Sequence, residues 1–318
     1  MDEEVERIAR DIESMKIRGA GRIAMAAASA LAITSSKSIA TSREEFVEEM
    51  LMAARRLIAT RPTAVSLPNS VRFVMKKLRE GVNASYSLEE LKRHVISTSK
   101  EFIKNSEEAV TKIGEYGSKL IEKNETIMTH CNSATAIEII KTANRQGKSI
   151  KVFATETRPL FQGHITSQIL SREGIDVTLI CDNAVRHFID KIDKVIVGAD
   201  AIAANGALVN KIGTSLVALA AKEASIPFIV GTETIKFSPE TIIGELIKIE
   251  ERPWSEVINA DILSNIGNIK VHNPAFDITP PEYVDMIVTE KGVIPPQGAI
   301  QVLSEEYGWL TPEELYIL

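Results

Sequence analysis

Hydrophobic positions along the chain recur with two different periods, and the change falls near residue 120. Before it, apolar residues follow the 3.6-residue period of amphipathic helices. This pattern predicts helices over residues 2–16, 21–33, 43–59, 70–80 and 87–118. The last of these opens with Ser87-Leu88-Glu89-Glu90, where the serine and the second glutamate have the spacing of a capping box. We therefore predict an all-helical N-terminal domain over residues 1–120.

After residue 120, short apolar runs alternate with helical segments. The runs predict strands near residues 125–129, 150–154, 176–180, 194–198 and 227–230, and a late run at 285–289 adds a further candidate. Strands that alternate with helices favour right-handed βαβ units and a parallel sheet. The predicted fold class is therefore α/β: the helical domain is followed, over residues 121–318, by a Rossmann-like parallel sheet domain with helices on both faces.

Composition limits the classes of function. The chain has 318 residues, 44% of them hydrophobic, which is enough to bury a substantial core. A net charge of −6 argues against general nucleic-acid binding, because affinity for a phosphate backbone needs an extended Lys/Arg surface. We also expect no membrane segment, since no apolar stretch reaches transmembrane length. Two cysteines give no disulfide framework, so we predict reduced thiols and a cytoplasmic protein.

Two reactive side chains, Cys131 and Asp200, lie 69 positions apart, each at the end of a hydrophobic run and before a helix-like segment. Strand ends of this kind line the ligand crevice of an open α/β sheet, so we expect the two groups to converge as an acid/base pair. The helix N-terminus should lower the pKa of the Cys131 thiol and make it a thiolate near neutrality. Desolvation should raise the pKa of Asp200. The alternatives are a small buried cysteine and a helix-capping aspartate.

Phosphate-binding candidates occur in both halves of the chain. Residues 16–22 contain two glycines and two arginines after a predicted helix, and Arg61 follows another. Glycine permits close approach of the backbone to a ligand, and the arginine fork binds phosphate. The alternative for each loop is an ordinary connection between helices, with its arginines in solvent. Polar residues also gather over 205–214, just before a later helix, where a substrate would lie. The five histidines show no metal-ligand spacing, so we predict no metal and no cofactor.

An ordered set of motifs resembles the superfamily that contains the regulatory subunits of translation factor eIF2B and several sugar-phosphate isomerases. The motifs span nearly the whole chain: Arg18-Gly19-Ala20-Gly21-Arg22-Ile23, His130-Cys131-Asn132-Ser133, Thr155-Glu156-Thr157-Arg158-Pro159-Leu160-Phe161-Gln162-Gly163, Val197-Gly198-Ala199-Asp200-Ala201-Ile202, Asn210-Lys211-Ile212-Gly213-Thr214 and Asn273-Pro274-Ala275-Phe276-Asp277-Ile278-Thr279-Pro280. Methylthioribose-1-phosphate isomerases usually carry proline where this chain has Gly21, and the translation subunits have no use for the Cys/Asp pair. The chain therefore most resembles the archaeal ribose-1,5-bisphosphate isomerases.

This resemblance implies an aldose-ketose isomerase that converts ribose 1,5-bisphosphate to ribulose 1,5-bisphosphate during the degradation of AMP and other nucleoside monophosphates. By the same resemblance, Cys131 as thiolate would take the C2 proton and Asp200 would transfer the proton between oxygens. The implied substrate-binding residues are Arg18, Gly19, Ala20, Gly21, Arg61, Ser133, Ala134, Thr135, Asn210, Lys211 and Lys236. A methylthioribose-1-phosphate isomerase and a non-catalytic eIF2B-like regulatory subunit remain the alternatives.

The resemblance also implies a homo-oligomer, at least a dimer and by extension a hexamer built as a trimer of dimers. Apolar residues over 271–276, with Tyr283, offer contact surface for it. Considered alone, Lys236 is more readily a solvated surface charge. We expect His130 to point to the opposite face of its strand from Cys131, and we leave the roles of Glu156 and Arg158 open, since their motif is compatible with a structural role.

Overall fold

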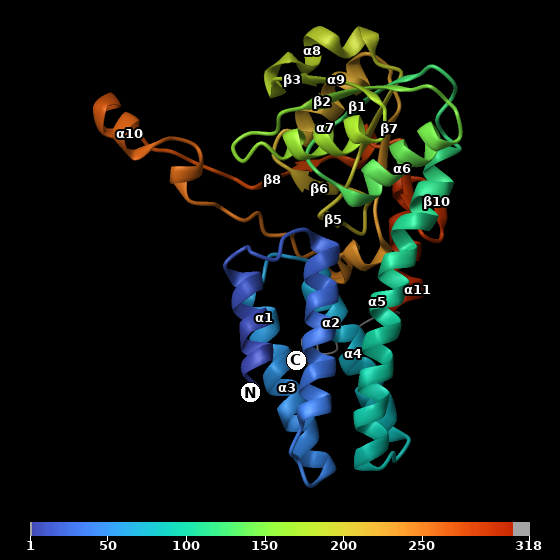
Figure 1. The fold of residues 1–318 in the computed structure, drawn as a ribbon, viewed down its shortest axis with the longest axis vertical. Helices are drawn as coiled ribbons and strands as arrows, with labels where there is room; N and C mark the ends of the chain where they lie inside the picture. Colours follow the sequence, from blue (N-terminus) through green and yellow to red (C-terminus); the bar gives the residue numbers. More distant parts are fainter. Residues whose placement is uncertain (1, 308–318) are drawn as a thin grey trace. The chain divides into compact units, whose positions relative to one another are not determined.

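The computed structural model describes residues 2–307 of the chain. These residues form two compact units, a helical unit over residues 2–109 and a sheet unit over residues 110–307. The division falls inside one long helix, α5 (Leu88–Ser118), so this helix contributes residues to both units. Figure 1 shows the helices of the first unit in blue to teal and the strands of the second in green to red.

The helical unit matches the helices that the apolar pattern predicts. It contains α1 (Glu3–Glu13), α2 (Ala20–Lys37), α3 (Arg43–Thr60), α4 (Ser66–Asn83) and the first part of α5. At the start of α5, the Ser87 backbone N–H donates to Glu90 Oε2 at 2.8 Å, which confirms the predicted capping contact. α4 begins four residues before its predicted start, because Pro68 lies in the first turn, where a helix tolerates proline.

The sheet unit is built around a seven-stranded sheet. Its strands are β1 (Thr126–Thr129), β2 (Lys151–Thr155), β3 (Asp176–Ile180), β4 (Lys194–Val197), β7 (Phe228–Gly231), β9 (Met286–Thr289) and β10 (Gly292–Ile294), in the order β10-β9-β7-β4-β1-β2-β3. All pair in parallel except β10, an antiparallel edge strand that the sequence pattern did not predict. The chain runs from β1 outward to β3 and then returns to the other side of β1 with β4. A topological switch point therefore lies between β1 and β4.

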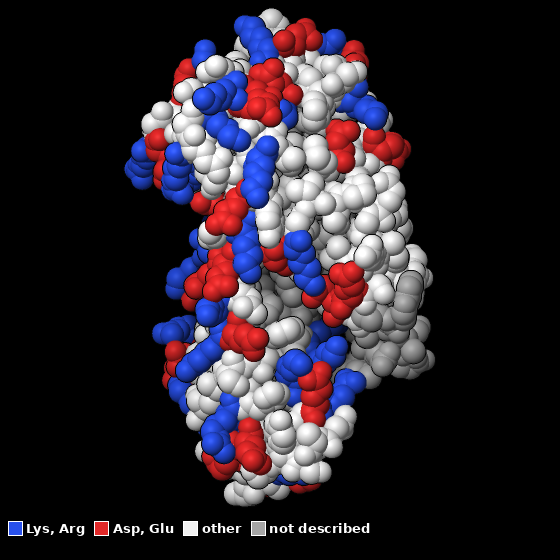
Figure 2. Space-filling view, turned by 90° about the vertical axis from the view of Figure 1, so that its right-hand side faces the viewer, with Lys and Arg blue, Asp and Glu red and all other residues white. Residues whose placement is uncertain are grey.

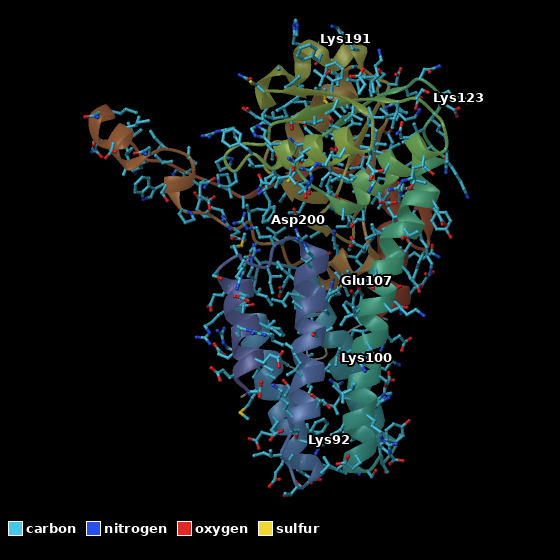
Figure 3. All side chains as sticks on the ribbon, viewed as in Figure 1. Lys92, Lys100, Glu107, Lys123, Lys191 and Asp200 are labelled. Atoms are coloured by element: carbon cyan, nitrogen blue, oxygen red, sulfur yellow. The ribbon has the colours of Figure 1, made fainter. Side chains whose placement is uncertain are left out.

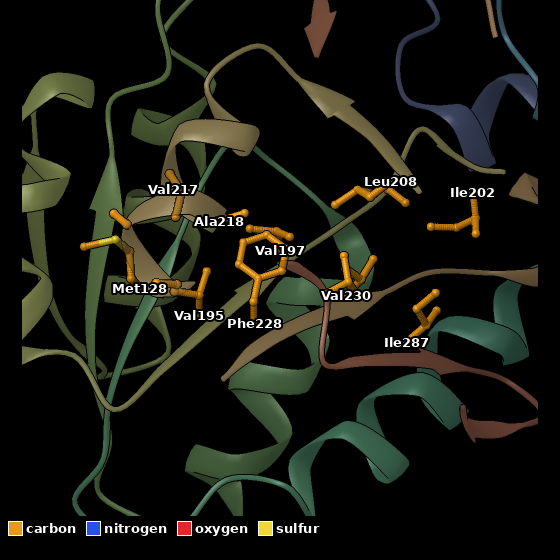
Figure 4. Close-up of a cluster of buried hydrophobic side chains, with 14 of the residues drawn as sticks. Met128, Val195, Val197, Ile202, Leu208, Val217, Ala218, Phe228, Val230 and Ile287 are labelled. Carbon is orange, nitrogen blue, oxygen red and sulfur yellow. The ribbon is translucent and has the colours of Figure 1, made fainter. Parts of the chain in front are cut away.

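Helices cover both faces of this sheet, as predicted. They are α6 (Ala134–Arg145), α7 (Gln162–Arg172), α8 (Val185–Phe188), α9 (Thr214–Glu223) and α11 (Ala299–Tyr307), together with the end of α5. Successive strand residues pack on opposite faces: Val195 and Val197 join the apolar cluster under α9, and Ile196 joins the cluster under α6. Phe228 and Val230 of the neighbouring strand belong to the α9 side, shown in Figure 4. These β-branched runs are buried on both sides, which is typical of parallel strands.

A second, antiparallel sheet was not predicted. It consists of β5 (Ala201–Ile202), β6 (Leu208–Lys211) and β8 (Phe276–Thr279), in the order β5-β6-β8. β6 lies inside the polar segment 205–214, and its partner β8 comes more than sixty residues later, so no local period marks the pairing. This small sheet carries Asn210 and Lys211.

Residues 250–252 and 273–275 pair and form the base of a long excursion, which we call the 250–275 hairpin. It carries the 3-10 turn η5 (Trp254–Glu256) and α10 (Ala260–Ile266), a helix with no buried residue, drawn in orange in Figure 1. Within the segment 271–276, Asn273 and Ala275 are buried in the base of the hairpin, whereas His272 is exposed. The exposed apolar side chains of this region are Leu246, Trp254, Ile262, Ile266 and Ile269.

Charged residues of both signs are interspersed over much of the face in Figure 2. Local ion pairs at the surface include Lys77 with Glu80 and Arg186 with Glu223. Among residues 2–307, no helix combines the length and apolarity that crossing a membrane requires.

Candidate active site

The carboxyl ends of three neighbouring strands bring the predicted residues of the sheet unit to one edge of the sheet. Cys131 follows β1, and Asp200 follows β4, on the two sides of the switch point. Lys236 ends the 3-10 turn η3 (Thr234–Lys236), which follows β7. Ile202 and Phe237 form a bridge that joins the segment after Asp200 to the residue after Lys236. In open α/β sheets ligands bind at such a position.

The Cys131 thiol is protonated at neutral pH. Its pKa is raised to about 12, chiefly by burial. The positive charge of Lys211 acts in the opposite direction, and the carboxylates of Asp200 and Asp182 raise the pKa. The expectation of a thiolate near neutrality is therefore wrong for this structure. Helix α6 begins only at Ala134, three residues after Cys131.

His130 is a buried structural link. Its Nε2 donates to the Ile212 carbonyl at 2.9 Å, so the neutral ring accepts at Nδ1 from the Thr155 hydroxyl, 2.6 Å away. Burial lowers the pKa of His130, which keeps the ring neutral. The ring thus ties the end of β1 to the end of β2 and to the loop after β6. Both of its nitrogens are bonded within the protein, and it does not face the site as a free base.

The loop after β6 holds Asn210 and Lys211. Asn210 is buried, and its Nδ2 donates to Thr214 Oγ1 at 3.0 Å. The Lys211 ammonium lies 5.0 Å from the centre of the Phe276 ring. Asp277 of β8 accepts hydrogen bonds from the N–H groups of Gly213 and Ser215 at the start of α9, and burial raises the pKa of this carboxyl to about 6.

Residues 133–135 form the start of α6. The Ser133 hydroxyl contacts that of Thr135, which in turn donates to the Gly231 carbonyl at the end of β7. These side chains are thus occupied by protein contacts, while the helix N-terminus is a general anion site. Gly198, just after β4, packs directly against Ser133: a Cβ at this glycine would lie 2.1 Å from Ser133 Oγ.

Lys236 is buried and only 7% exposed. Its ammonium forms an ion pair with Glu233 at 2.7 Å, and both side chains are almost fully covered. The alternative of a solvated surface lysine is therefore wrong. The same turn η3 is tied to the segment between β9 and β10, where Glu290 accepts from the Thr234 backbone N–H.

The helical unit carries the other predicted residues, at the start of α2 and at the end of α3. Arg18 is exposed, and its Nε donates to the Met15 carbonyl at 2.7 Å. Gly19, with φ 88°, is the N-cap of α2, and Ala20 and Gly21 form its first turn. The Ser66 hydroxyl donates to the Ala20 carbonyl at 2.9 Å, which places the loop that contains Arg61 beside the loop before α2. Each unit therefore carries one group of candidate residues; Figure 3 labels Asp200 in the sheet unit.

The sequence pattern missed Asp182, Thr157 and Thr166. The charge of Asp182 acts on the Cys131 thiol, and the two threonine hydroxyls bond to the backbone of Cys131. The Thr-Arg-Pro motif was the available signal, but these contacts join segments far apart in sequence. Among residues 2–307, no cluster of three or more His, Cys, Asp or Glu side chains is placed to hold a metal ion.

Comparison with known proteins agrees with this architecture. Residues 16–296 match the Initiation factor 2 subunit family. The ribose 1,5-bisphosphate isomerase of Thermococcus kodakarensis is 52% identical over 307 residues, which cover 96% of this chain and 95% of that protein. The methylthioribose-1-phosphate isomerase of Acetivibrio thermocellus is 43% identical over 303 residues, covering 91% and 87%. The crystal structure of the Pyrococcus horikoshii translation initiation factor eIF-2B superposes with a TM-score of 0.80 at 31% identity, covering 95% of this chain and 100% of that one.

The chain belongs to the Initiation factor 2 subunit family. Within this family it is an enzyme of the isomerase class, as its near full-length relatives are. The predicted resemblance and the predicted fold class are both confirmed.

Proposed function

We propose that this protein converts ribose 1,5-bisphosphate to ribulose 1,5-bisphosphate. The observation that carries the proposal is the placement of Cys131 and Asp200 on the two sides of the switch point, after adjacent strands. The relative at 52% identity is named for this reaction, and its identity exceeds the 43% of the methylthioribose-1-phosphate isomerase. We further propose that the reaction belongs to the degradation of AMP and other nucleoside monophosphates, in the cytoplasm.

The reaction needs two groups that exchange protons. Moving the carbonyl from C1 to C2 of the opened sugar requires loss of the C2 proton, gain of a proton at C1, and transfer of a proton between the two oxygens. We assign the carbon protons to Cys131 and the oxygen proton to Asp200, through an enediol-like intermediate. Positioned proton transfer typically contributes about 10²- to 10⁴-fold to a rate.

The raised pKa of Cys131 constrains how this pair can work. A thiol with a pKa of about 12 supplies a thiolate fraction of only roughly 10⁻⁵ at pH 7. We infer that the thiol passes its proton to the Asp200 carboxylate before the C2 proton is removed. This exchange yields both required forms, a thiolate base and a neutral carboxylic acid, and no proton is lost from the pair. The nearby Lys211 charge favours the thiolate.

The two phosphates of the substrate require cations and backbone donors. We propose that Arg18, with the backbone of residues 19–21, and Arg61 supply them from the helical unit. Lys211 and Lys236, with Asn210 and the α6 N-terminus at residues 133–135, would supply them from the sheet unit. At Lys236 a phosphate would compete with the Glu233 carboxylate that now pairs with the ammonium.

We also propose that the protein is a homodimer at least, and a hexamer built as a trimer of dimers. The support is the exposed apolar side chains of the 250–275 hairpin together with Leu216 and Leu219 on α9. Light scattering at micromolar concentration should return a mass of at least two chains. A monomer would contradict the proposed assembly but leave the proposed reaction standing.

A coupled assay tests the function directly. Purified protein is incubated with ribose 1,5-bisphosphate, and ribulose 1,5-bisphosphate is measured as the product. Methylthioribose 1-phosphate, tested in parallel, should be turned over at a much lower kcat/KM. Preference for that compound would make the protein a methylthioribose-1-phosphate isomerase. Binding of ribose 1,5-bisphosphate without product would favour a non-catalytic regulator.

A further inference from the structure

The backbone of Cys131 adopts an unusual conformation. Its φ of 70° lies in the left-handed region, which costs energy for a residue that carries a Cβ. Such a conformation persists only where the surroundings hold it, and it recurs at functional sites. The contacts that hold Cys131 therefore determine where its thiol points.

Two threonine hydroxyls hold the two polar groups of the Cys131 backbone. The Cys131 N–H donates to Thr157 Oγ1 at 2.9 Å, and Thr166 Oγ1 donates to the Cys131 carbonyl at 2.7 Å. Both threonines are buried, with at most 1% of their surface exposed. Thr157 follows β2, and Thr166 lies in the second turn of α7, so the two contacts reach Cys131 from separate elements.

Thr157 is itself fixed from a third strand. Its N–H donates to Asp182 Oδ1 at 2.7 Å, and the N–H of Arg158 donates to the other carboxylate oxygen at the same distance. Asp182 begins the turn after β3, and Thr157 also has a positive φ, 63°. A hydrogen-bonded chain thus runs from the end of β3, through Thr157, to the backbone of Cys131.

We propose that Thr157 and Thr166 are positioning residues, which hold the Cys131 backbone in its left-handed conformation so that the thiol faces the substrate. Asp182 serves the same end by fixing the Thr157 loop. The inference rests on the proposed proton-transfer role of Cys131. It assigns a purpose to the Glu-Thr-Arg-Pro motif: the threonine acts on the site, while the Arg158 guanidinium donates to the Val257 carbonyl and lies 5.1 Å from the centre of the Phe161 ring.

The test compares variants that remove or keep each hydroxyl. Thr157→Val and Thr166→Val delete the bonds at similar volume, and Thr157→Ser and Thr166→Ser retain them. Ser167→Ala is the matched control, because the Ser167 hydroxyl donates to the Gly163 carbonyl within the same helix and does not touch Cys131. We expect each valine variant to lower kcat by at least about tenfold with KM within about twofold of wild type, because small displacements of a reacting group are costly. The serine variants and Ser167→Ala should keep near wild-type kcat.

A second readout does not depend on turnover. In a Cys181→Ser background, the rate of Cys131 alkylation by iodoacetamide is measured against pH. The valine variants should shift this profile relative to the background protein, and the serine variants should restore it. Wild-type kcat and an unchanged profile in both valine variants would overturn the proposal, as would an equal loss of kcat in Ser167→Ala.

Failure of the proposed function can be told apart from failure of the positioning proposal. If the wild-type chain does not isomerise ribose 1,5-bisphosphate, the proposed function fails, and the alkylation profile alone decides whether the threonines control the thiol. Circular dichroism melting identifies a variant that does not fold. In that case the variant at the other threonine, with its own serine control, decides the outcome.

Discussion

The sheet unit and the helical unit hold their candidate residues in different ways. In the sheet unit, Lys236 is buried in an ion pair, Asn210 is buried in a hydrogen bond, and the Cys131 backbone is bonded on both sides. In the helical unit, Arg18 is exposed on a short loop beside the N-cap of α2. Protein contacts hold the sheet-unit side chains in fixed positions, whereas the exposed arginine side chain can reorient as a ligand arrives.

The largest effect is expected at the acid/base pair. Cys131→Ser replaces the thiol by a hydroxyl that stays protonated at neutral pH, and Asp200→Asn cannot relay a proton. Each change should lower kcat by about 10²- to 10⁴-fold or more, and the double variant should be little worse than either single one. Isothermal titration should still detect ribose 1,5-bisphosphate binding. Cys181→Ser, at the exposed second cysteine, is the control and should keep wild-type turnover. Wild-type turnover in Cys131→Ser would contradict the proposed mechanism.

The buried lysine should couple binding to stability. Lys236→Ala leaves the Glu233 carboxylate buried without its partner, so we expect a loss of about 3–5 kcal/mol in the free energy of unfolding as well as a higher KM. Urea denaturation measures the first and steady-state kinetics the second. Lys222→Ala, at an exposed lysine of α9, should change neither quantity. Unaltered stability in Lys236→Ala would show that the pair is not buried as described.

The exposed arginine should affect binding alone. If Arg18 binds phosphate as proposed, Arg18→Ala removes charge-assisted hydrogen bonds worth about 1.5–3 kcal/mol, so KM should rise roughly tenfold to a hundredfold. Its unfolding free energy should stay within about 0.5 kcal/mol of wild type, as is usual for a surface site. Lys16→Ala in the same loop is the control, since Lys16 is solvent-exposed and pairs only with Asp11 among the described residues. A KM equal to wild type in Arg18→Ala and Arg61→Ala would contradict the proposed phosphate-binding role of these two arginines.

The smallest effect concerns pH. Burial raises the pKa of Asp277 from 3.8 to about 6. Between about pH 4 and 6 the folded state therefore binds more protons than the unfolded state. As the pH rises through this range, the Asp277 carboxyl lowers the stability of the folded state. The lowered pKa of His130 has the opposite effect on stability. This histidine contributes to the stability of the folded state above about pH 6.5, and the contribution is lost as the pH falls.

Asp277→Asn separates these two opposing contributions. The variant should gain stability on going from pH 4 to 6.5 more steeply than wild type, because it lacks the opposing contribution of the Asp277 carboxyl. Guanidinium unfolding curves at several pH values measure the difference. Parallel curves for the two proteins would contradict the raised pKa.

Local sequence signals predicted most of the fold. The β-branched run at 194–197 and the Ser87–Glu90 capping contact need only neighbouring residues, and both were placed correctly. The antiparallel sheet was missed, because β6 pairs with β8 across a long separation and the segment reads as polar. The same limit applies to the site. The residue types and strand ends at Cys131 and Asp200 were visible in the sequence, but the pKa of the thiol depends on burial by distant segments.

The contacts of the threonine hydroxyls with Cys131 and the burial of Lys236 could not be predicted from the sequence either. Thr157 reaches Cys131 from 26 positions away, and Asp182 reaches Thr157 from 25 positions away. Neither distance follows a helical or strand period. A lysine six residues beyond a strand gives no sign of a buried partner, although Glu233 lies only three positions before it.

The contact between Gly198 and Ser133 has a consequence for the spacing of the thiol and the carboxylate. A methyl group at position 198 would lie 2.1 Å from the Oγ and 2.4 Å from the Cβ of Ser133, too close for a rotation of the serine to relieve. Substitution by alanine would therefore push the segment after β1 away from the segment after β4. Those segments carry Cys131 and Asp200, so we expect the substitution to change the spacing between the thiol and the carboxylate. A glycine that has no side chain allows the two segments to approach as closely as they do.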